Sequence, residues 1–445
     1  MKLIKFSNPI IFGLIIGLTF NCTPQKDSIP ESIKLKAIES ASPESVGFSS
    51  DSLNRVEAMV NKYVDLGFIP GGVILIARHG KVVYEKAIGW NNIEAQEKYT
   101  VDNQFRLASM TKPITSVAIM QLYEKGKLDL QDPLSKYIPE FSNPMVLTAF
   151  NAEDTTWESR EAKREVTIHQ LLTQTSGISY GFMSPQMFGA IYAKNGIPDG
   201  ANYLDISLEK KMALLGKAPL AFDPGEKWNY GLSTDVLGRV VEVASGMSLD
   251  VYTSQYITEP LGMKDTKFFY KDTLSHNVAS LYVPLADTAI MEMKHQDGMP
   301  VSPDFPFRGA KKYLSGGSGL NGTARDYFVF TQSMLNGGNW GDVRILKEKT
   351  VSDMMSNQID TVSYPWGAGK FGYGFHVITE DGSDIRSQKI GRSSWGGIFH
   401  TMFWIDPARD IVAIMMSQVL SNPNKPRIDA EFESIINNAL VDESK

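Results

Sequence analysis

Two hairpin patterns, one near each end of the chain, constrain the fold more than any other feature of the sequence. In residues 73–84, two apolar and β-branched runs flank the turn His79-Gly80. In residues 400–416, two further apolar runs flank the polar segment 406–410. This arrangement predicts one antiparallel sheet that is built from both chain ends, with the middle of the chain inserted between them.

The middle of the chain has the apolar spacing of helices, and Pro224-Gly225 and Gly337-Gly338 mark breaks in it. We therefore predict an α/β (α+β) fold, in which helices flank the antiparallel sheet and a mainly helical subdomain is inserted. The domain should cover residues 46–445, with its sheet part at about 46–125 and 310–445 and its helical part at about 126–309. The expected helices are 112–125, 168–174, 236–244 and 326–335, with a closing amphipathic helix over 431–440.

The first residues are typical of an export signal. Lys2 and Lys5 precede an apolar run over 10–18, which is too short to span a bilayer. We therefore expect residues 1–21 to be a signal peptide and the polar stretch 22–45 to be a tether.

Cys22, the only cysteine, directly follows the expected signal peptide. Its surroundings resemble a bacterial lipoprotein signal, whose cysteine becomes the lipidated first residue. Phe20 and Asn21 are bulkier than the usual small pair before such a cysteine, so ordinary cleavage or an inert thiol stays open. With lipidation, the protein would be exported and held to a membrane only through its N-terminal lipid, facing the periplasm or the cell exterior.

Composition argues against several classes of partner. The formal net charge is -6 and there is no Lys/Arg-rich block, so we expect no nucleic-acid partner. One cysteine rules out an intrachain disulfide and a cysteine-based zinc site, and the six histidines form no His-Glu-x-x-His pair. We therefore expect no metal and no cofactor.

Ser109 and Lys112 stand three residues apart at the start of an apolar segment, 114–122, that should form a buried helix. At a helix start both side chains face the same way, and a lysine can help to remove the proton of a serine nucleophile. Ser207 and Lys210 have the same spacing but an acidic neighbour, so they are better explained as a solvated helix start.

The motif around Ser109 resembles the nucleophile helix of the serine β-lactamase and penicillin-binding-protein superfamily. The resemblance extends in order through 169–177, 224–238, 316–320 and Trp395-Gly396-Gly397, and it covers about residues 50 to 440. It is greatest for the class C-like branch, and within it for the family VIII carboxylesterases. It implies that Ser109 is the nucleophile, that Lys112 assists its deprotonation, and that Tyr230 is the phenol of the second motif, with Lys112 favouring its phenolate.

Two departures from the superfamily pattern bear on the substrate. Leu232 stands where the second motif usually has an asparagine, and Trp395 stands where the third motif usually has a lysine. Both changes remove groups that hold a β-lactam, and the indole suits an apolar acyl or alcohol group.

The same resemblance places further residues at the site. It implies an oxyanion hole formed by the N–H groups of Ser109 and Ile398. We expect Trp395, Gly396, Gly397 and His400 to line the substrate site.

The favoured function is a serine hydrolase that acts through an acyl-enzyme on a small ester or amide, as a carboxylesterase. A β-lactamase or a D-peptidase acting on peptidoglycan-type substrates remains an alternative in the same fold. A non-catalytic cell-wall binding module is an alternative of another class.

Overall fold

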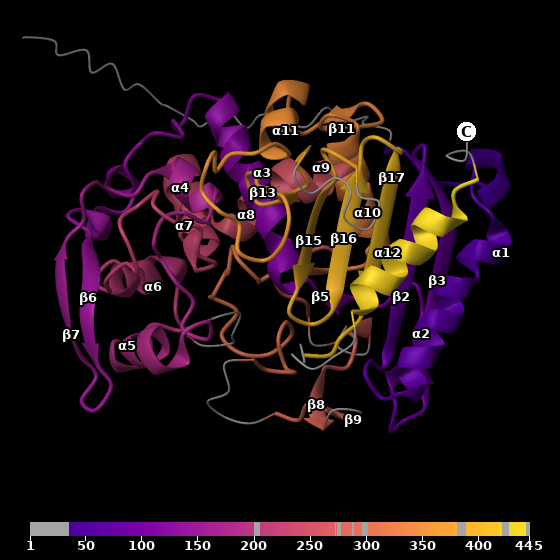
Figure 1. Ribbon diagram of the computed structural model, residues 1–445, viewed down its shortest axis with the longest axis horizontal. Helices are drawn as coiled ribbons and strands as arrows, with labels where there is room; N and C mark the ends of the chain where they lie inside the picture. Colours follow the sequence, from indigo (N-terminus) through magenta and orange to yellow (C-terminus); the bar gives the residue numbers. More distant parts are fainter. Residues whose placement is uncertain are drawn as a thin grey trace, which may run out of the picture. The chain divides into compact units, whose positions relative to one another are not determined.

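A mixed sheet joins the two ends of the chain, as the hairpin patterns predicted (Figure 1). The computed structural model describes residues 35–199, 205–271, 273, 277–286, 289–295, 301–380, 389–420 and 427–441. Within these, nine strands pair in the order β1-β3-β2-β17-β16-β15-β14-β13, with β4 beside β3. The strands are β1 (Glu39–Ser40), β2 (Gly71–Arg78), β3 (Lys81–Asn92), β4 (Glu97–Lys98), β13 (Lys370–Phe371), β14 (His376–Val377), β15 (Ser393–Gly397), β16 (Thr401–Asp406) and β17 (Ile411–Met416).

Pairing between β17 and β2 joins the C-terminal hairpin to the N-terminal one, with Ile414 opposite Leu75. Both strands are buried on both faces, which explains why their sequences are continuous apolar runs rather than alternating ones. The predicted fold is thus confirmed for the sheet.

One part of the expected tether belongs to this sheet. Strand β1 pairs with β3 in parallel, with Glu39 opposite Lys81, so the folded unit begins before residue 46. Both residues of β1 are exposed, and an edge strand that pairs only through its backbone leaves no apolar pattern in the sequence. The expected signal peptide 1–21 and Cys22 lie outside the described residues.

Helices cover both faces of the sheet. The closing helix α12 (Ile428–Ala439) packs with α1 (Ser50–Leu53) and α2 (Arg55–Asp65) over one face, where Phe432 contacts Trp404 of β16. Helix α10 (Ala324–Leu335) covers the other face, where Tyr327 contacts Phe403 of the same strand. Neighbouring residues of β16 therefore point to opposite layers, as a strand requires.

Helix α3 (Thr111–Glu124) runs between the sheet and the inserted part of the chain (Figure 1). Its residues 111–122 are all buried, because the sheet side and helix α7 (Ser233–Ser245) enclose it. This environment explains why the apolar residues of the segment are not confined to one stripe of the helix. It also places Ser109, just before α3, where the two halves of the fold meet.

The inserted part contains the expected helices and two hairpins that the apolar spacing did not predict. Hairpin β6–β7 is mostly exposed on both faces, so its residues show no alternation. Among the described residues, no helix has the length and apolarity needed to cross a membrane. The remaining helices are α4 (Ile168–Leu172), α5 (Ala190–Lys194), α6 (Leu208–Leu215), α8 (Leu249–Thr253), α9 (Glu259–Leu261) and α11 (Glu348–Met354), and the remaining strands are β5 (Phe105–Arg106), β6 (Met145–Asn151), β7 (Thr156–Glu161), β8 (Tyr282–Ala286), β9 (Ala289–Glu292), β10 (Asn321–Gly322), β11 (Asn339–Trp340) and β12 (Val343–Arg344).

Candidate active site

Ser109 lies in a short 3-10 turn, Ala108–Met110, that leads directly into α3. Ala108 has a φ of 46°, a left-handed conformation that an alanine seldom adopts and that turns the chain sharply before Ser109. Lys112, one helical turn later, is 1% exposed and donates to the Ser109 hydroxyl over 3.1 Å. The turn thus presents a half-buried hydroxyl at the positive end of a helix, next to a buried amine.

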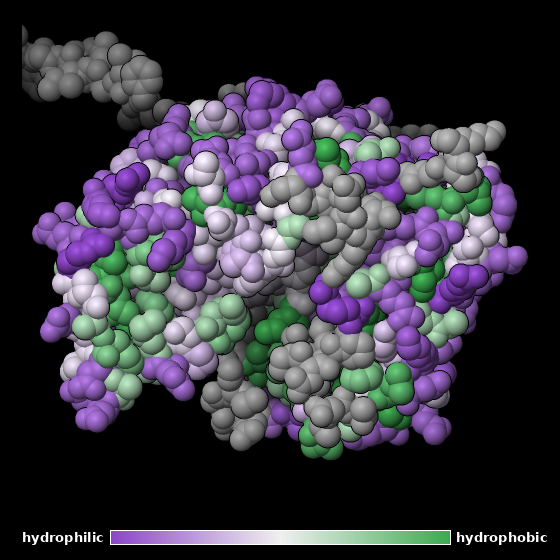
Figure 2. Space-filling model, in the orientation of Figure 1, coloured by the Kyte–Doolittle hydropathy of each residue, from purple (hydrophilic) through white to green (hydrophobic). Residues whose placement is uncertain are grey.

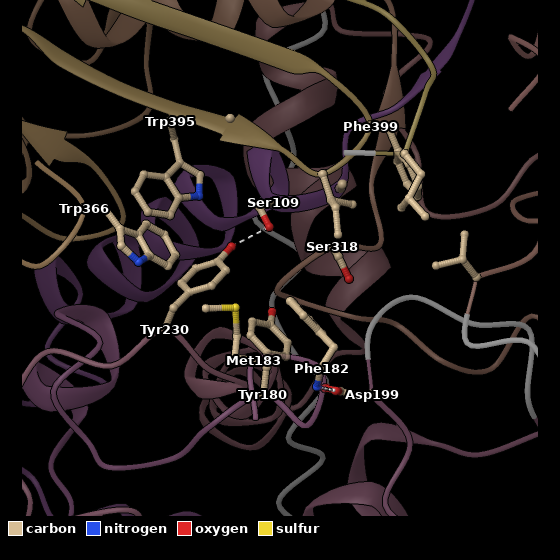
Figure 3. A pocket seen from close by; sticks show the side chains of 15 residues that line it. Ser109, Tyr180, Phe182, Met183, Asp199, Tyr230, Ser318, Trp366, Trp395 and Phe399 are labelled. Atoms are coloured by element: carbon tan, nitrogen blue, oxygen red, sulfur yellow. Dashed lines mark hydrogen bonds between the residues drawn. The ribbon is translucent and has the colours of Figure 1, made fainter. Parts of the chain in front are cut away.

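Tyr230, in the loop before α7, contacts the same hydroxyl, and Lys112 Nζ lies 4.5 Å from the centre of its ring. Its phenol donates to Ser109 Oγ at 2.5 Å, which Figure 3 shows as a dashed line. The backbone beside it is fixed by Gln174, whose side-chain oxygen accepts the Gly231 N–H at 3.0 Å. Gly231 must lack a side chain here, because a Cβ would lie 2.0 Å from the Ile178 carbonyl oxygen. The structure therefore brings together the three residues that the resemblance named.

Burial acts in opposite directions on the two proton-carrying groups beside Ser109. It lowers the pKa of Lys112 to about 7, although the charge of Asp235 opposes this. It raises the pKa of Tyr230, and the hydrogen bond with Ser109 opposes that shift. At neutral pH the lysine can therefore be an uncharged amine that accepts a proton, while Tyr230 stays a protonated donor. This is the reverse of the phenolate that the resemblance implied, because burial disfavours the charged form of both groups.

The end of β15 forms the third side of the site. A Cβ on Gly397 would lie 2.6 Å from the Leu107 carbonyl oxygen, so only glycine lets this strand approach the Ser109 turn so closely. Thr401 donates to the same carbonyl at 3.1 Å and holds the strand against the turn. Ile398, directly after β15, lines the same cavity as Ser109.

This cavity has a volume of about 610 Å³ and mostly apolar walls. A recess with hydrophobic side chains at its wall opens near the middle of the face in Figure 2. In Figure 3 the ring of Trp395 lies beside Tyr230, and the two ring centroids are 5.6 Å apart. The described lining residues are Ala108, Ser109, Tyr180, Phe182, Met183, Asp199, Tyr230, Val301, Ser318, Trp366, Trp395, Gly396, Ile398, Phe399 and Leu420.

Two residues that the sequence analysis placed at the substrate site do not line the Ser109 cavity. His400 is buried in the turn after β15, with a φ of 63°, and its Nδ1 pairs with the Val419 carbonyl at 3.0 Å. It lines a neighbouring cavity with Gly397, and neither residue is among those that line the Ser109 cavity. Trp395 and Gly396 line both cavities.

Sequence reasoning missed two prominent residues. Tyr180 OH accepts a hydrogen bond from Lys112 Nζ at 3.0 Å, so this tyrosine completes the surroundings of the amine together with the Gly317 carbonyl at 2.9 Å. Trp366 is 48% exposed and stacks on Trp395 with ring centroids 6.0 Å apart. Tyr180 follows the matched segment 169–177 by three residues, which is the only signal that pointed to it.

The described residues contain no group of three or more histidine, cysteine, aspartate or glutamate side chains that could hold a metal ion.

A family model described as Beta-lactamase matches residues 56–437 of this chain. The chain belongs to this family. It is 30% identical over 393 residues to the esterase EstB of Burkholderia gladioli, covering 85% of this chain and 94% of that protein. It is 26% identical over 423 residues to a putative D-alanyl-D-alanine carboxypeptidase of Escherichia coli (strain K12), covering 89% and 88%.

Among solved structures, the chain resembles EstCE1, described as a hydrolase with promiscuous acyltransferase activity. The TM-score is 0.73 at 27% identity, and the superposition covers 86% of this chain and 98% of that one. The family and these relatives agree with the geometry at Ser109: the protein is a serine hydrolase of the β-lactamase fold, in the branch that resembles the family VIII carboxylesterases.

Proposed function

We propose that the protein is a carboxylesterase that forms an acyl-enzyme at Ser109 and prefers neutral, apolar esters. The observation that carries this proposal is the lining of the cavity. None of the described residues that line it is lysine or arginine, and the one carboxyl group among them belongs to Asp199. A substrate carboxylate would be desolvated there without a cation beside it, which costs several kcal/mol. A neutral ester meets no such cost.

In the proposed reaction, Ser109 Oγ attacks the ester carbonyl carbon and its proton passes to the neutral amine of Lys112. The N–H groups of Ser109 and Ile398 stabilise the oxyanion. The leaving alkoxide takes a proton from Tyr230, which regains one from the Lys112 ammonium, and the acyl group stays on Ser109. In the second half of the reaction, water takes the place of Ser109 as the nucleophile and attacks the acyl carbon. Ser109 Oγ is then the leaving group and regains a proton, and the carboxylic acid is released.

The relatives support this proposal to different degrees. EstB is called an esterase, while the Escherichia coli relative is called a putative D-alanyl-D-alanine carboxypeptidase. A D-peptidase or β-lactamase therefore remains the second candidate, although Trp395 and Leu232 replace the groups that the superfamily uses to hold such substrates. The hydrogen-bonded arrangement of Ser109, Lys112 and Tyr230 argues against a non-catalytic binding module.

A parallel assay tests the proposal. Wild-type enzyme is given p-nitrophenyl butyrate, nitrocefin and a D-Ala-D-Ala peptide, with Ser109→Ala as the control. We expect the highest kcat/KM with the neutral ester, and loss of turnover and of fluorophosphonate labelling in Ser109→Ala. Faster hydrolysis of nitrocefin or of the peptide would refute the esterase assignment.

We also propose that Cys22 is lipidated after removal of residues 1–21, so that the enzyme is exported and membrane-anchored. The support for this is the sequence pattern alone. Expression with labelled palmitate tests it: wild-type protein should carry label in the membrane fraction, and Cys22→Ala should carry none. Unlabelled, unanchored wild-type protein would refute it.

A further inference from the structure

A buried charged cluster lies beside the active site and takes no direct part in the chemistry proposed above. Lys211 of α6 and Asp235 of α7 are both fully buried, with their charged atoms 3.6 Å apart. Tyr313 joins them: it accepts a hydrogen bond from Lys211 and donates to Asp235 Oδ1 at 2.7 Å. Since such a buried pair can often be replaced by apolar residues without loss of stability, its presence calls for another explanation.

Asp235 directs its second carboxylate oxygen toward the catalytic side. Among the residues that the structure describes, none forms a hydrogen bond with the buried Oδ2. It lies so close to Gly317 that a Cβ there would be 2.6 Å from it and 3.0 Å from the Tyr180 hydroxyl. Gly317 and Tyr180 are the two groups, besides Ser109, that hold the Lys112 amine. One glycine thus separates an unpaired carboxylate oxygen from the immediate surroundings of the lysine.

We infer that Asp235 is a positioning residue for the reaction, whose free carboxylate oxygen acts across Gly317 on the Lys112 amine and sets the pH at which Ser109 becomes reactive. Lys211 and Tyr313 hold the other carboxylate oxygen and fix its direction. The inference rests on the proposed role of Lys112 as the base. It also explains why the segment 316–319 carries a glycine at position 317, where any side chain would displace Asp235.

The sign of the effect follows from the charges around Lys112. A negative charge nearby stabilises the ammonium form, so Asp235 opposes the depression of the Lys112 pKa that burial causes. Removing that charge should favour the neutral amine, and Ser109 should then react at lower pH. Other titratable groups surround Lys112 and Asp235, and each comes from a different part of the inserted subdomain or its borders. They are Tyr180 (after α4), Asp199 (after α5), Lys211 (in α6), Tyr230 (before α7) and Tyr313 (before Gly316).

The test measures the rate of Ser109 labelling by a fluorophosphonate as a function of pH, which needs no ester substrate. In wild type the rate should rise with pH through about 7, as Lys112 loses its proton. We call this rise the ascending limb of the pH–rate profile. In Asp235→Asn we expect the midpoint of the ascending limb to move down by about one pH unit, so that labelling at about pH 6 is several-fold faster than in wild type. Asp326→Asn is the matched control: Asp326 is also a buried carboxylate in the first turn of a helix, but it accepts bonds from Asp265 and Thr266.

The inference is overturned if the midpoint pH of the ascending limb in Asp235→Asn stays the same or rises. It is also overturned if this midpoint shifts no more than it does in Asp326→Asn. Should Asp235→Asn fail to fold, the double variant Lys211→Met/Asp235→Asn leaves no uncompensated buried charge, and a smaller downward shift is expected, because the lost cation partly offsets the lost carboxylate. Different results would contradict the proposed function rather than the role of Asp235. A wild-type enzyme that labels at Ser109 and ignores neutral esters contradicts the esterase assignment, and unchanged labelling of Lys112→Ala contradicts the role of Lys112 as the base.

Discussion

Replacing Lys112 by methionine should make the folded protein more stable while abolishing catalysis. Burial lowers the Lys112 pKa from 10.5 to about 7. At about 1.4 kcal/mol per unit, charging this amine therefore costs about 5 kcal/mol more in the folded protein than in the unfolded chain. Methionine has nearly the same shape but forfeits hydrogen bonds to Ser109, Tyr180 and Gly317, at about 1 kcal/mol each. The net gain below about pH 7 is on the order of 2 kcal/mol.

The gain should depend on pH in a defined direction. Between about pH 7 and 10.5 the unfolded chain binds the Lys112 proton and the folded protein does not, so wild-type stability rises with pH across this window. The advantage of Lys112→Met should therefore shrink as pH rises and reverse near about pH 8. Urea unfolding at about pH 6 and about pH 9 measures both values. The exposed Lys127, changed to methionine, is the control and should show no such trend.

A variant that is less stable than wild type at about pH 6 would refute this reasoning. So would a stability difference that is the same at both pH values, because the penalty would then not come from the proton on Lys112.

Three further substitutions test separate parts of the site. Tyr230→Phe removes the donor to Ser109 but keeps the aromatic packing, so acylation in stopped-flow assays should fall by about 10²- to 10⁴-fold with an unchanged melting temperature; a minor loss of rate would contradict its role. Trp395→Lys should weaken turnover of apolar esters and improve that of anionic ones. Steady-state kinetics with matched neutral and acidic esters measure this, and the opposite change in preference would contradict the prediction. Gly397→Ala should push β15 away from the Leu107 carbonyl and lower kcat by about 10²-fold or more, as for a lost oxyanion donor, whereas a normal kcat would show that the close approach is not needed.

Much of this arrangement could be predicted from the sequence, because strong local patterns encode it. The continuous apolar runs of β2 and β17 follow from burial on both faces, and they placed both chain ends in one sheet. Ser109 and Lys112 could be paired because three residues make one helical turn. Tyr230 could be found only through the resemblance, since 121 residues separate it from Ser109.

The rest depends on contacts that no local pattern records. Tyr180 and Trp366 reach the site through loops whose paths are set by the whole fold. The exposed edge strand β1 pairs through its backbone, so composition classed it with the tether. The ionisation of Lys112 and Tyr230 follows from burial, which the sequence does not state and which reversed the expected form of the phenol. His400 illustrates a fourth limit, because its own left-handed conformation in the turn after β15 places its ring in a neighbouring cavity.

Trapping the covalent intermediate tests the account most directly. The enzyme is mixed with p-nitrophenyl butyrate, quenched in acid during the initial burst of p-nitrophenol, digested, and analysed by mass spectrometry. We expect one butyryl group on the peptide that carries Ser109, and none in Ser109→Ala. A butyryl group on a different side chain, or steady ester turnover with Ser109 unmodified at every quench time, would contradict the assignment of Ser109 as the nucleophile.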